Sequence, residues 1–157
     1  MRTLETERMI LRDWDLADLS DFLEMHNKNE GESQLRYLIN AKNNYALVLK
    51  DSNKVIGSVG LNEDADNNPN GRNLGYILNK LYWDRGYMQE ALREIIKNAS
   101  EVTSFLSAAF SISNYNEKSL HIINKLGFKL VKTINSGTNE TTGEPCEGFH
   151  YYVLELS

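Results

Sequence analysis

The sequence predicts an α+β protein in which a mixed, largely antiparallel sheet is flanked by helices. Two apolar runs of strand length flank the turn residues 51–53, which predicts an antiparallel hairpin. Apolar residues spaced three and four apart from Met88 onwards predict an amphipathic helix. We interpret 1–157 as one domain, because 157 residues can bury a single core and no repeat or low-complexity linker interrupts them.

The first strand is predicted at 8–14, where RMILRDW alternates apolar and polar residues. Asp15 then fits the N-cap of a helix. The apolar face expected for that helix consists of Leu16, Leu19, Phe22 and Leu23. A shorter helix is predicted at 33–42, and its apolar side consists of Leu35, Leu38 and Ile39.

The predicted hairpin joins strands at 44–50 and 54–62. The stretch 63–72, EDADNNPNGR, is the most polar in the chain and is expected to be a surface loop long enough to carry function. The next strand is predicted at 73–78.

The second half of the chain alternates helices and strands. The helix from Met88 is followed by a strand at 105–112, whose small residues suit burial on both faces. A helix is predicted at 116–126, and Gly127 fits its C-terminal cap, where a left-handed backbone is needed. Two further strands are expected at 128–134 and 149–156.

Composition excludes several classes of protein. The hydrophobic share of 41% and charged share of 25% are ordinary for a soluble protein, and no run approaches the length of a membrane-spanning helix. The net charge of −5 disfavours duplex nucleic acid as a partner. Residues 1–14 are charged throughout, unlike a signal peptide, and the single Cys146 has no metal-ligand context. We therefore expect a cytoplasmic protein without a metal, as a monomer or homodimer.

The stretch YWDRGYMQEAL, residues 82–92, places Gly86 between an apolar strand and a helix. The first N–H groups of a helix have no intrahelical partner and bind anions well. Gly86 allows close approach of the backbone to an anion, and Arg85 adds a charge. Neither a P-loop ending in G-K-[ST] nor a G-x-G-x-x-G pattern is present, which excludes those nucleotide-binding motifs.

A second motif follows at 114–128, NYNEKSLHIINKLGF. Together the two motifs resemble the acetyl-CoA-binding core of the GNAT acetyltransferases, in the RimJ/RimL-like branch. There the loop usually reads W-G-K-G-Y-A-T-E-A-L and the later helix N-x-x-S-x-x-x-x-x-K-L-G-F. The matching residues are Trp83, Gly86, Tyr87, Glu90, Ala91 and Leu92, then Asn116, Ser119, Lys125, Leu126, Gly127 and Phe128. The segments 4–14 and 55–61 also resemble that branch, so the likeness covers nearly the whole chain.

The resemblance implies a GNAT-like sheet that is splayed between its fourth and fifth strands. It implies that acetyl-CoA is the co-substrate and that its pyrophosphate lies on the backbone of Arg85, Gly86, Tyr87, Met88 and Gln89. The pantetheine arm is expected along Tyr76, Ile77 and Leu78, opposite 110–111, with Asn116 and Ser119 as further contacts. Met88 stands where the family has Ala or Gly, and we interpret it as the start of the helix's apolar stripe. Ile123 stands where many relatives carry a tyrosine that protonates the departing thiolate.

The implied reaction is direct attack of a neutral primary amine on the thioester, through a tetrahedral intermediate. A backbone N–H near Leu78 is the implied oxyanion donor, and Ser119 is the candidate acid for the thiolate. Glu63 is the candidate base, with Glu30 and Glu32 as alternatives, since Asn73 replaces a glutamate common in relatives. Deprotonating a lysine amine at neutral pH costs about 4–5 kcal/mol and an α-amine about 1–1.5 kcal/mol.

A chain without an obvious base therefore favours an amine of low pKa, either a protein N-terminus or a small molecule. Two other functions stay open. One is a catalytically silent acyl-CoA-binding regulatory module, suggested by Met88 and the missing tyrosine. The other is a structural interaction domain, which failure to bind CoA would favour.

Overall fold

The computed structural model describes residues 2–26, 29–135, 137–138, 143 and 145–156. The chain divides into two compact parts. The first consists of 1–62 with 75–98, and the second of 63–74 with 99–157. Each part is described in turn.

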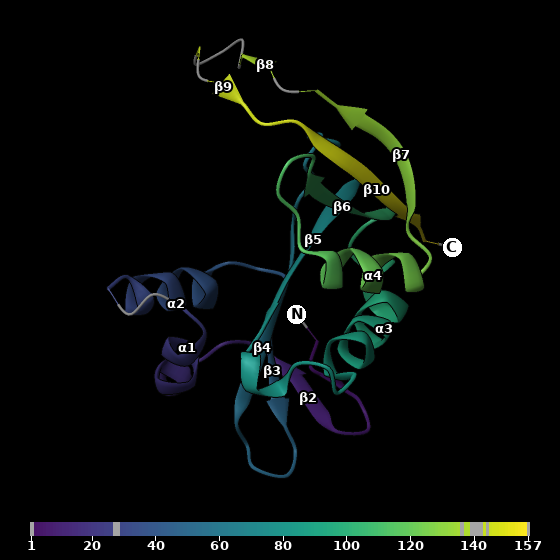
Figure 1. Cartoon of the computed structure of the whole chain (residues 1–157). Helices are drawn as coiled ribbons and strands as arrows, with labels where there is room; N and C mark the ends of the chain where they lie inside the picture. The colour runs from purple at the N-terminus through teal and green to yellow at the C-terminus, as the bar shows by residue number, and fades with distance from the viewer. Residues whose placement is uncertain (1, 27–28, 136, 139–142, 144, 157) are drawn as a thin grey trace. The chain divides into compact units, whose positions relative to one another are not determined.

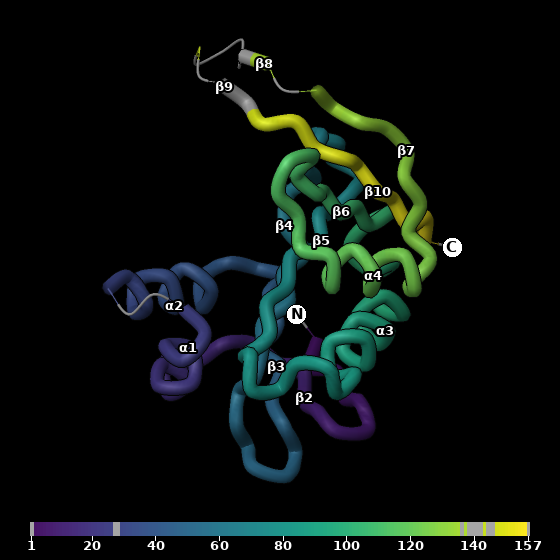
Figure 2. The backbone as a smooth tube through the Cα atoms, in the orientation of Figure 1, coloured from purple at the N-terminus to yellow at the C-terminus, as the bar shows by residue number. Residues whose placement is uncertain are grey.

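The first part contains the N-terminal strands, which pair antiparallel in chain order. They are β1 (Leu4–Glu5), β2 (Met9–Arg12), β3 (Asn44–Leu49) and β4 (Val55–Glu63). The predicted hairpin is confirmed, and its turn contains Asn53 with a φ of 59°. Figure 2 shows this turn as the loop that projects at the bottom of the view.

Two short helical segments follow β2. Asp15 caps η1 (Leu16–Asp18) by accepting a hydrogen bond from the Ala17 N–H at 2.8 Å, as predicted. The helices α1 (Leu19–Met25) and α2 (Gly31–Asn40) come next and lie on one side of β3 and β4 in Figure 1. The core beneath them consists of Trp14, Phe22, Leu35, Ala46, Val48 and Val55.

The predicted apolar faces of the two helices are wrong at two residues, which are exposed and not buried. Leu16 is 45% exposed and Ile39 is 37% exposed. Leu16 lies in a 3-10 turn that precedes α1, and the tighter winding of that turn changes the angle between successive side chains. A prediction that assumes one α-helical period over 16–23 therefore places Leu16 on the buried side, although its side chain is exposed.

The amphipathic helix predicted from Met88 is α3 (Tyr87–Ala99). Its buried residues are Met88, Ala91, Leu92, Ile95 and Ala99, which confirms the predicted spacing. In Figure 1, α3 lies on the opposite side of the strands from α1 and α2. The end of β5 (Gly71–Leu78) and η2 (Lys80–Tyr82) lead into it.

The second part is built around β6 (Phe105–Ser111). The start of β5 pairs with β6 in parallel, from Gly71↔Phe105 to Asn73↔Ser107. On the other side, β10 (Phe149–Glu155) runs antiparallel to β6 and also pairs with β7 (Lys129–Ile134). The strands β8 (Gly137–Thr138) and β9 (Pro145–Cys146) form a small ribbon that the sequence did not predict. The helix predicted at 116–126 is α4 (Glu117–Lys125).

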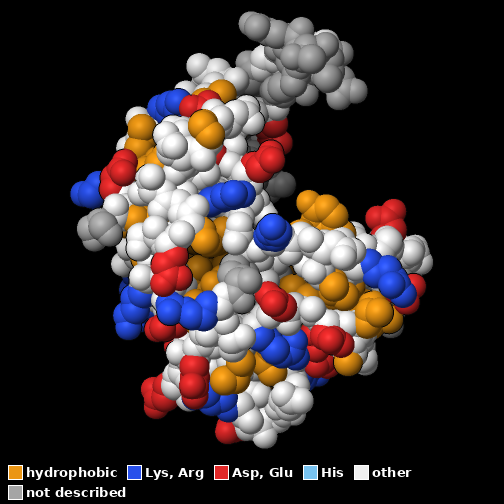
Figure 3. Space-filling model, turned by 180° about the vertical axis from the view of Figure 1, so that it is seen from behind, with side chains coloured by type: hydrophobic (Ala, Val, Ile, Leu, Met, Phe, Trp, Pro, Cys, Tyr) orange, Lys and Arg blue, Asp and Glu red, His pale blue; other side chains and the backbone are white. Residues whose placement is uncertain are grey.

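The strand order is β1-β2-β3-β4-β5-β6-β10-β7, with β5 and β6 parallel. The predicted mixed, largely antiparallel α+β fold is confirmed. The fourth and fifth predicted strands are β5 and β6, which pair in parallel over 71–73 and 105–107, and the expected splay stays a prediction. No helix within the described ranges is both long and apolar enough to cross a membrane. Figure 3 shows acidic and basic side chains interspersed over one face.

The surface loop predicted at 63–72 is wrong at its two ends, because Glu63 belongs to β4 and 71–72 to β5. It is also wrong at Asp64, which is only 4% exposed. Its carboxylate accepts hydrogen bonds from the hydroxyls of Ser107 and Tyr151 and from two backbone N–H groups of its own loop. Burial by itself would raise the pKa of Asp64, but these hydrogen bonds outweigh it and hold the pKa below its ordinary value. Burial and the bond to Asp64 raise the pKa of Tyr151 well above its usual range.

Candidate active site

The turn before α3 has an unusual backbone. Asp84 has a φ of 63° and Gly86 a φ of 79°, so two left-handed residues flank Arg85. The first hydrogen bond of the helix runs from the Glu90 N–H to the Gly86 carbonyl at 3.1 Å. The N–H groups of the three preceding residues (87–89) therefore come before the intrahelical ladder, and helix starts of this kind bind anions well in general.

Arg8, near the start of the chain, contacts the turn and the first residues of α3. Its Nη2 donates to the Arg85 carbonyl at 3.1 Å, and its guanidinium lies 4.0 Å from the centre of the Tyr87 ring. Its Nε donates to Glu90 at 2.8 Å, and Glu90 also accepts from the Thr6 hydroxyl. Arg8 thus fixes the Arg85 carbonyl and the first turn of α3 in one arrangement.

Glu90 is held as a carboxylate in this arrangement. Partial burial would raise its pKa, but hydrogen bonds from Thr6 and Arg8 outweigh burial and lower it below the ordinary value. Sequence reasoning matched Glu90 to the family motif and did not single out Arg8. The signal available for Arg8 was its place in the N-terminal stretch 4–14, which resembles the same branch.

Met88 does not crowd the predicted pyrophosphate loop. Its side chain is 4% exposed and belongs to the buried stripe of α3, as the sequence predicted. A Cβ added to Gly86 would meet only the Arg8 Nη2, at 3.7 Å, so the space beside the turn is open. Both observations fit a diphosphate against this backbone.

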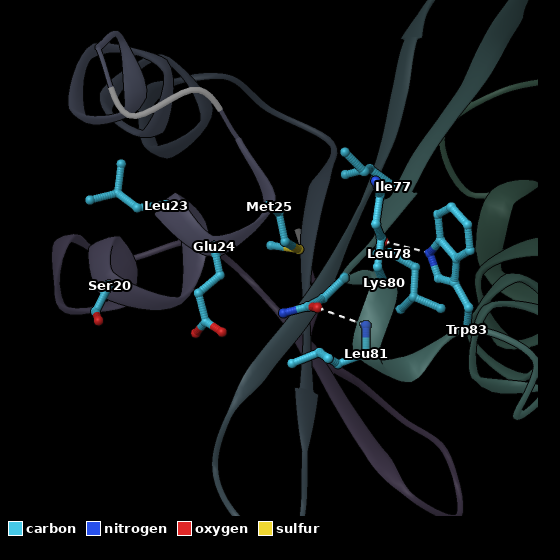
Figure 4. A pocket seen from close by; sticks show the side chains of 10 residues that line it. Ser20, Leu23, Glu24, Met25, Ile77, Leu78, Lys80, Leu81 and Trp83 are labelled. Carbon is cyan, nitrogen blue, oxygen red and sulfur yellow. Dashed lines mark hydrogen bonds between the residues drawn. The ribbon is translucent and has the colours of Figure 1, made fainter.

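The predicted pantetheine contacts lie at the end of β5. Ile77 is 38% exposed, and Tyr76 and Leu78 are partly buried. The Leu78 carbonyl accepts a hydrogen bond from the Trp83 indole N–H at 2.8 Å, which ties the end of β5 to the loop before α3 (Figure 4). Gln89, in the first turn of α3, is partly buried.

In the second part, Asn116 caps α4. Its Oδ1 accepts the N–H groups of Lys118 at 2.9 Å and Ser119 at 3.2 Å. Ser119 is partly buried in the first turn, whereas Ile123 is fully buried in the next. The cap brings Asn116 and Ser119 together, and their roles toward acetyl-CoA stay predictions.

The candidate bases are at exposed positions. Glu63 is the last residue of β4, and Glu30 and Glu32 lie at the start of α2, where Glu32 is 3.9 Å from Arg36. Within the described residues, no group of three or more His, Cys, Asp or Glu side chains is arranged to hold a metal. The assignment of a base stays a prediction.

Sequence reasoning missed a pocket of about 750 Å³ in the first part. One wall comes from α1 and the other from the end of β5, η2 and Trp83, as Figure 4 shows. Most of its lining is apolar: Leu23, Met25, Ile77, Leu78, Leu81 and Trp83. The polar lining includes Glu24 and Asn79. The residues come from segments more than fifty positions apart, so no local pattern indicates the pocket.

Comparison with protein families matches residues 8–129 to the acetyltransferase (GNAT) domain. The chain belongs to the GNAT acetyltransferase family. The predicted resemblance is thereby confirmed, and this GNAT protein is an acetyl-CoA-dependent N-acetyltransferase. The match includes both motifs, from the loop at Gly86 to the end of α4.

Similar proteins agree with this GNAT assignment. "Uncharacterized N-acetyltransferase p20" of Bacillus licheniformis is 25% identical over 150 residues, 82% of this chain and 83% of the relative. A GNAT acetyltransferase structure from Bacillus anthracis has a TM-score of 0.80 at 16% identity over 98% of both chains.

An acetyltransferase from Salmonella typhimurium, described as modifying the N-terminal serine of ribosomal protein L7/L12, has a TM-score of 0.75 at 12% identity. The structural alignment covers 99% of this chain and 100% of the Salmonella typhimurium chain. Identities this low show the fold alone, and at that level they agree with the predicted RimJ/RimL-like branch.

Proposed function

We propose that this protein transfers an acetyl group from acetyl-CoA to a primary amine, by direct attack of the neutral amine through a tetrahedral intermediate. The observation that supports the proposal is the turn at 84–86, whose two left-handed residues precede a helix with its first backbone hydrogen bond at Glu90. A solved GNAT neighbour, the self-immunity acetyltransferase MccE, is described as a complex with acetyl-CoA and AMP.

The turn holds the pyrophosphate through the backbone at 85–89. One anion at an exposed helix N-terminus gains only about 0.3–1 kcal/mol, whereas micromolar binding needs about 8 kcal/mol. The pantetheine arm must therefore contribute most of the affinity. Tyr76, Ile77 and Leu78 at the end of β5 are our candidates for that contact, together with Asn116 and Ser119.

The chemical roles follow from the reaction. A backbone N–H near Leu78 stabilises the oxyanion, Ser119 protonates the departing thiolate, and Glu63 accepts the proton of the amine. The acceptor is a peptide N-terminus or a small-molecule amine. An α-amine suits a site whose candidate base is exposed, because it is deprotonated at a cost of only about 1–1.5 kcal/mol.

The alternative is a silent acyl-CoA-binding module. One reason for this alternative was the bulk of Met88 near the pyrophosphate. The burial of that side chain removes this reason. The other reason, the missing tyrosine, remains, because Ile123 is apolar and fully buried and cannot donate a proton. Acetyl transfer therefore stays the better supported function.

The test is an acceptor screen with acetyl-CoA that follows the release of free CoA thiol. The panel contains L-alaninamide, a short peptide with a free N-terminus, spermidine and an aminoglycoside, each with a blank that lacks protein. We expect thiol release above the blank with at least one amine. Binding of acetyl-CoA without release in any assay would favour the silent module, and absence of binding would contradict both.

A further inference from the structure

Asn79 lies between β5 and η2 and is only 5% exposed. Its backbone N–H donates to the Ile56 carbonyl at 2.8 Å. Its Oδ1 accepts the Leu81 N–H at 3.0 Å and so caps η2, one of the two bonds dashed in Figure 4. This cap fixes the orientation of the amide, because the reversed amide would set its NH₂ group against another N–H donor.

The other half of the amide has no partner. Within the described residues, the Asn79 Nδ2 is buried and has no hydrogen-bond acceptor. Leaving a buried donor unpaired costs about 1–3 kcal/mol. The cap does not explain the cost, because Asp caps a helix as well as Asn does and, when ionised, carries no donor.

The surroundings indicate what the donor is for. Asn79 lines the pocket of Figure 4, whose volume of about 750 Å³ suits a small molecule or the end of a peptide. The nearby Glu24 carboxylate already accepts two hydrogen bonds from Lys54, at 2.8 and 3.1 Å. Lys80 also lines the pocket, so side chains of both charges are present, and the uncharged amide donor itself suits a neutral oxygen.

We propose that Asn79 determines acceptor specificity, and that its Nδ2 donates a hydrogen bond to a carbonyl oxygen of the amine bound in this pocket. The inference rests on the proposed acetyl transfer to an amine. It narrows the acceptor to amines that carry a carbonyl beside the reacting nitrogen, as α-amino amides do.

The test compares two probes that differ in the carbonyl. L-Alaninamide carries a carboxamide on the carbon next to its amine, and isopropylamine carries a methyl group there. The measured quantity is the ratio of kcat/KM for the two probes, in the wild type and in two variants. Asn79→Asp keeps shape and cap but loses the donor, and Asn79→Ser keeps a capping oxygen without adding charge. We expect the preference for alaninamide to fall about tenfold or more in both variants.

Acetyl-CoA affinity, measured by calorimetry, is the control and should stay within about twofold of wild type. An unchanged alaninamide preference in the two variants overturns the proposal. Weakened acetyl-CoA binding also overturns it, because Asn79 would then contact the co-substrate. The melting temperature of each variant shows that it is folded.

A binding measurement separates this inference from the proposed function. The neutral product N-acetyl-L-alaninamide is titrated into the ¹⁵N-labelled wild type and Asn79→Asp, and the Leu81 amide signal is followed. We expect a shift in the wild type and about tenfold weaker binding in the variant. No acetylation of any amine would refute the proposed function alone, whereas no binding or equal binding in this titration would refute the role of Asn79.

Discussion

At Gly86 the backbone conformation requires glycine, whereas the space around it does not. Its φ of 79° is unfavourable for a residue with a Cβ, although the nearest atom to an added Cβ is 3.7 Å away. We expect Gly86→Ala to cost roughly 1–2 kcal/mol of stability and to weaken acetyl-CoA binding, measured by thermal unfolding and calorimetry.

Gly86→Asn is the matched control, because Asn adopts left-handed backbone more readily and should lose less. Proline is a poorer probe, because it cannot adopt a positive φ and would break the turn itself. Equal acetyl-CoA affinity in wild type and Gly86→Ala would argue against the turn as the pyrophosphate site.

Asp64 ties the loop after β4 to β6 and β10. Because its folded-state pKa is lowered, its stabilising contribution is complete above the unfolded value of about 4 and is lost as pH falls through the folded value. We expect Asp64→Asn to lose about 2 kcal/mol at neutral pH and to flatten the acid side of the stability profile.

The measurement is urea unfolding at several values of pH. Asp66→Asn is the control, since Asp66 is an exposed partner of Lys132 and an exposed pair contributes at most about 1 kcal/mol. If the free energy of unfolding falls equally steeply with decreasing pH in wild type and Asp64→Asn, another carboxylate governs acid unfolding.

Ser119 is the candidate acid for the thiolate. A thiol with a reference pKa of about 8.5 is already a tolerable leaving group, so an acid supplies less than the roughly 10²–10⁴-fold usual for proton transfer. Ser119→Ala should lower kcat about tenfold, with little change in acetyl-CoA affinity. Weaker CoA binding with unchanged single-turnover transfer would make Ser119 a cofactor contact.

At the scale of the element, α4 depends on its cap. Asn116 uses its Oδ1 for the N–H groups of Lys118 and Ser119, so only its Nδ2 is left for the predicted pantetheine contact. Asn116→Ala should cost about 1 kcal/mol of stability, measured by urea unfolding, whereas Asn116→Ser restores the cap.

The two variants also separate the roles of Asn116. If its Nδ2 holds the pantetheine arm, both variants should weaken acetyl-CoA binding, although only Asn116→Ala loses the cap. If Asn116→Ser binds acetyl-CoA as the wild type does, Asn116 is a helix cap and not a cofactor contact.

At the scale of the whole molecule, the sequence predicts one domain over 1–157. A single domain unfolds in one cooperative transition, so we expect equal calorimetric and van't Hoff enthalpies. Acetyl-CoA at about 100 times its Kd should add about 2.7 kcal/mol of stability and raise Tm by roughly 5–10 °C. Two separate transitions, with acetyl-CoA shifting only one, would show that the parts unfold independently.

Local patterns in the sequence determined most of the elements of this protein. The β3–β4 hairpin, α3 and the Asp15 cap of η1 follow from turn residues, helical spacing and a capping side chain, which act over a few positions. The two motifs around Gly86 and Asn116 indicated the family for the same reason, because each lies in one short stretch.

Only the tertiary structure decided which polar side chains are buried and what they contact. Asp64 looks like a loop residue in the sequence, yet its hydroxyl partners are 43 and 87 positions away. The sequence did not single out Asn79, whose buried Nδ2 has no acceptor within the described residues, as only the folded chain shows. Hydrogen bonds and cavities join distant segments, so no local periodicity encodes them.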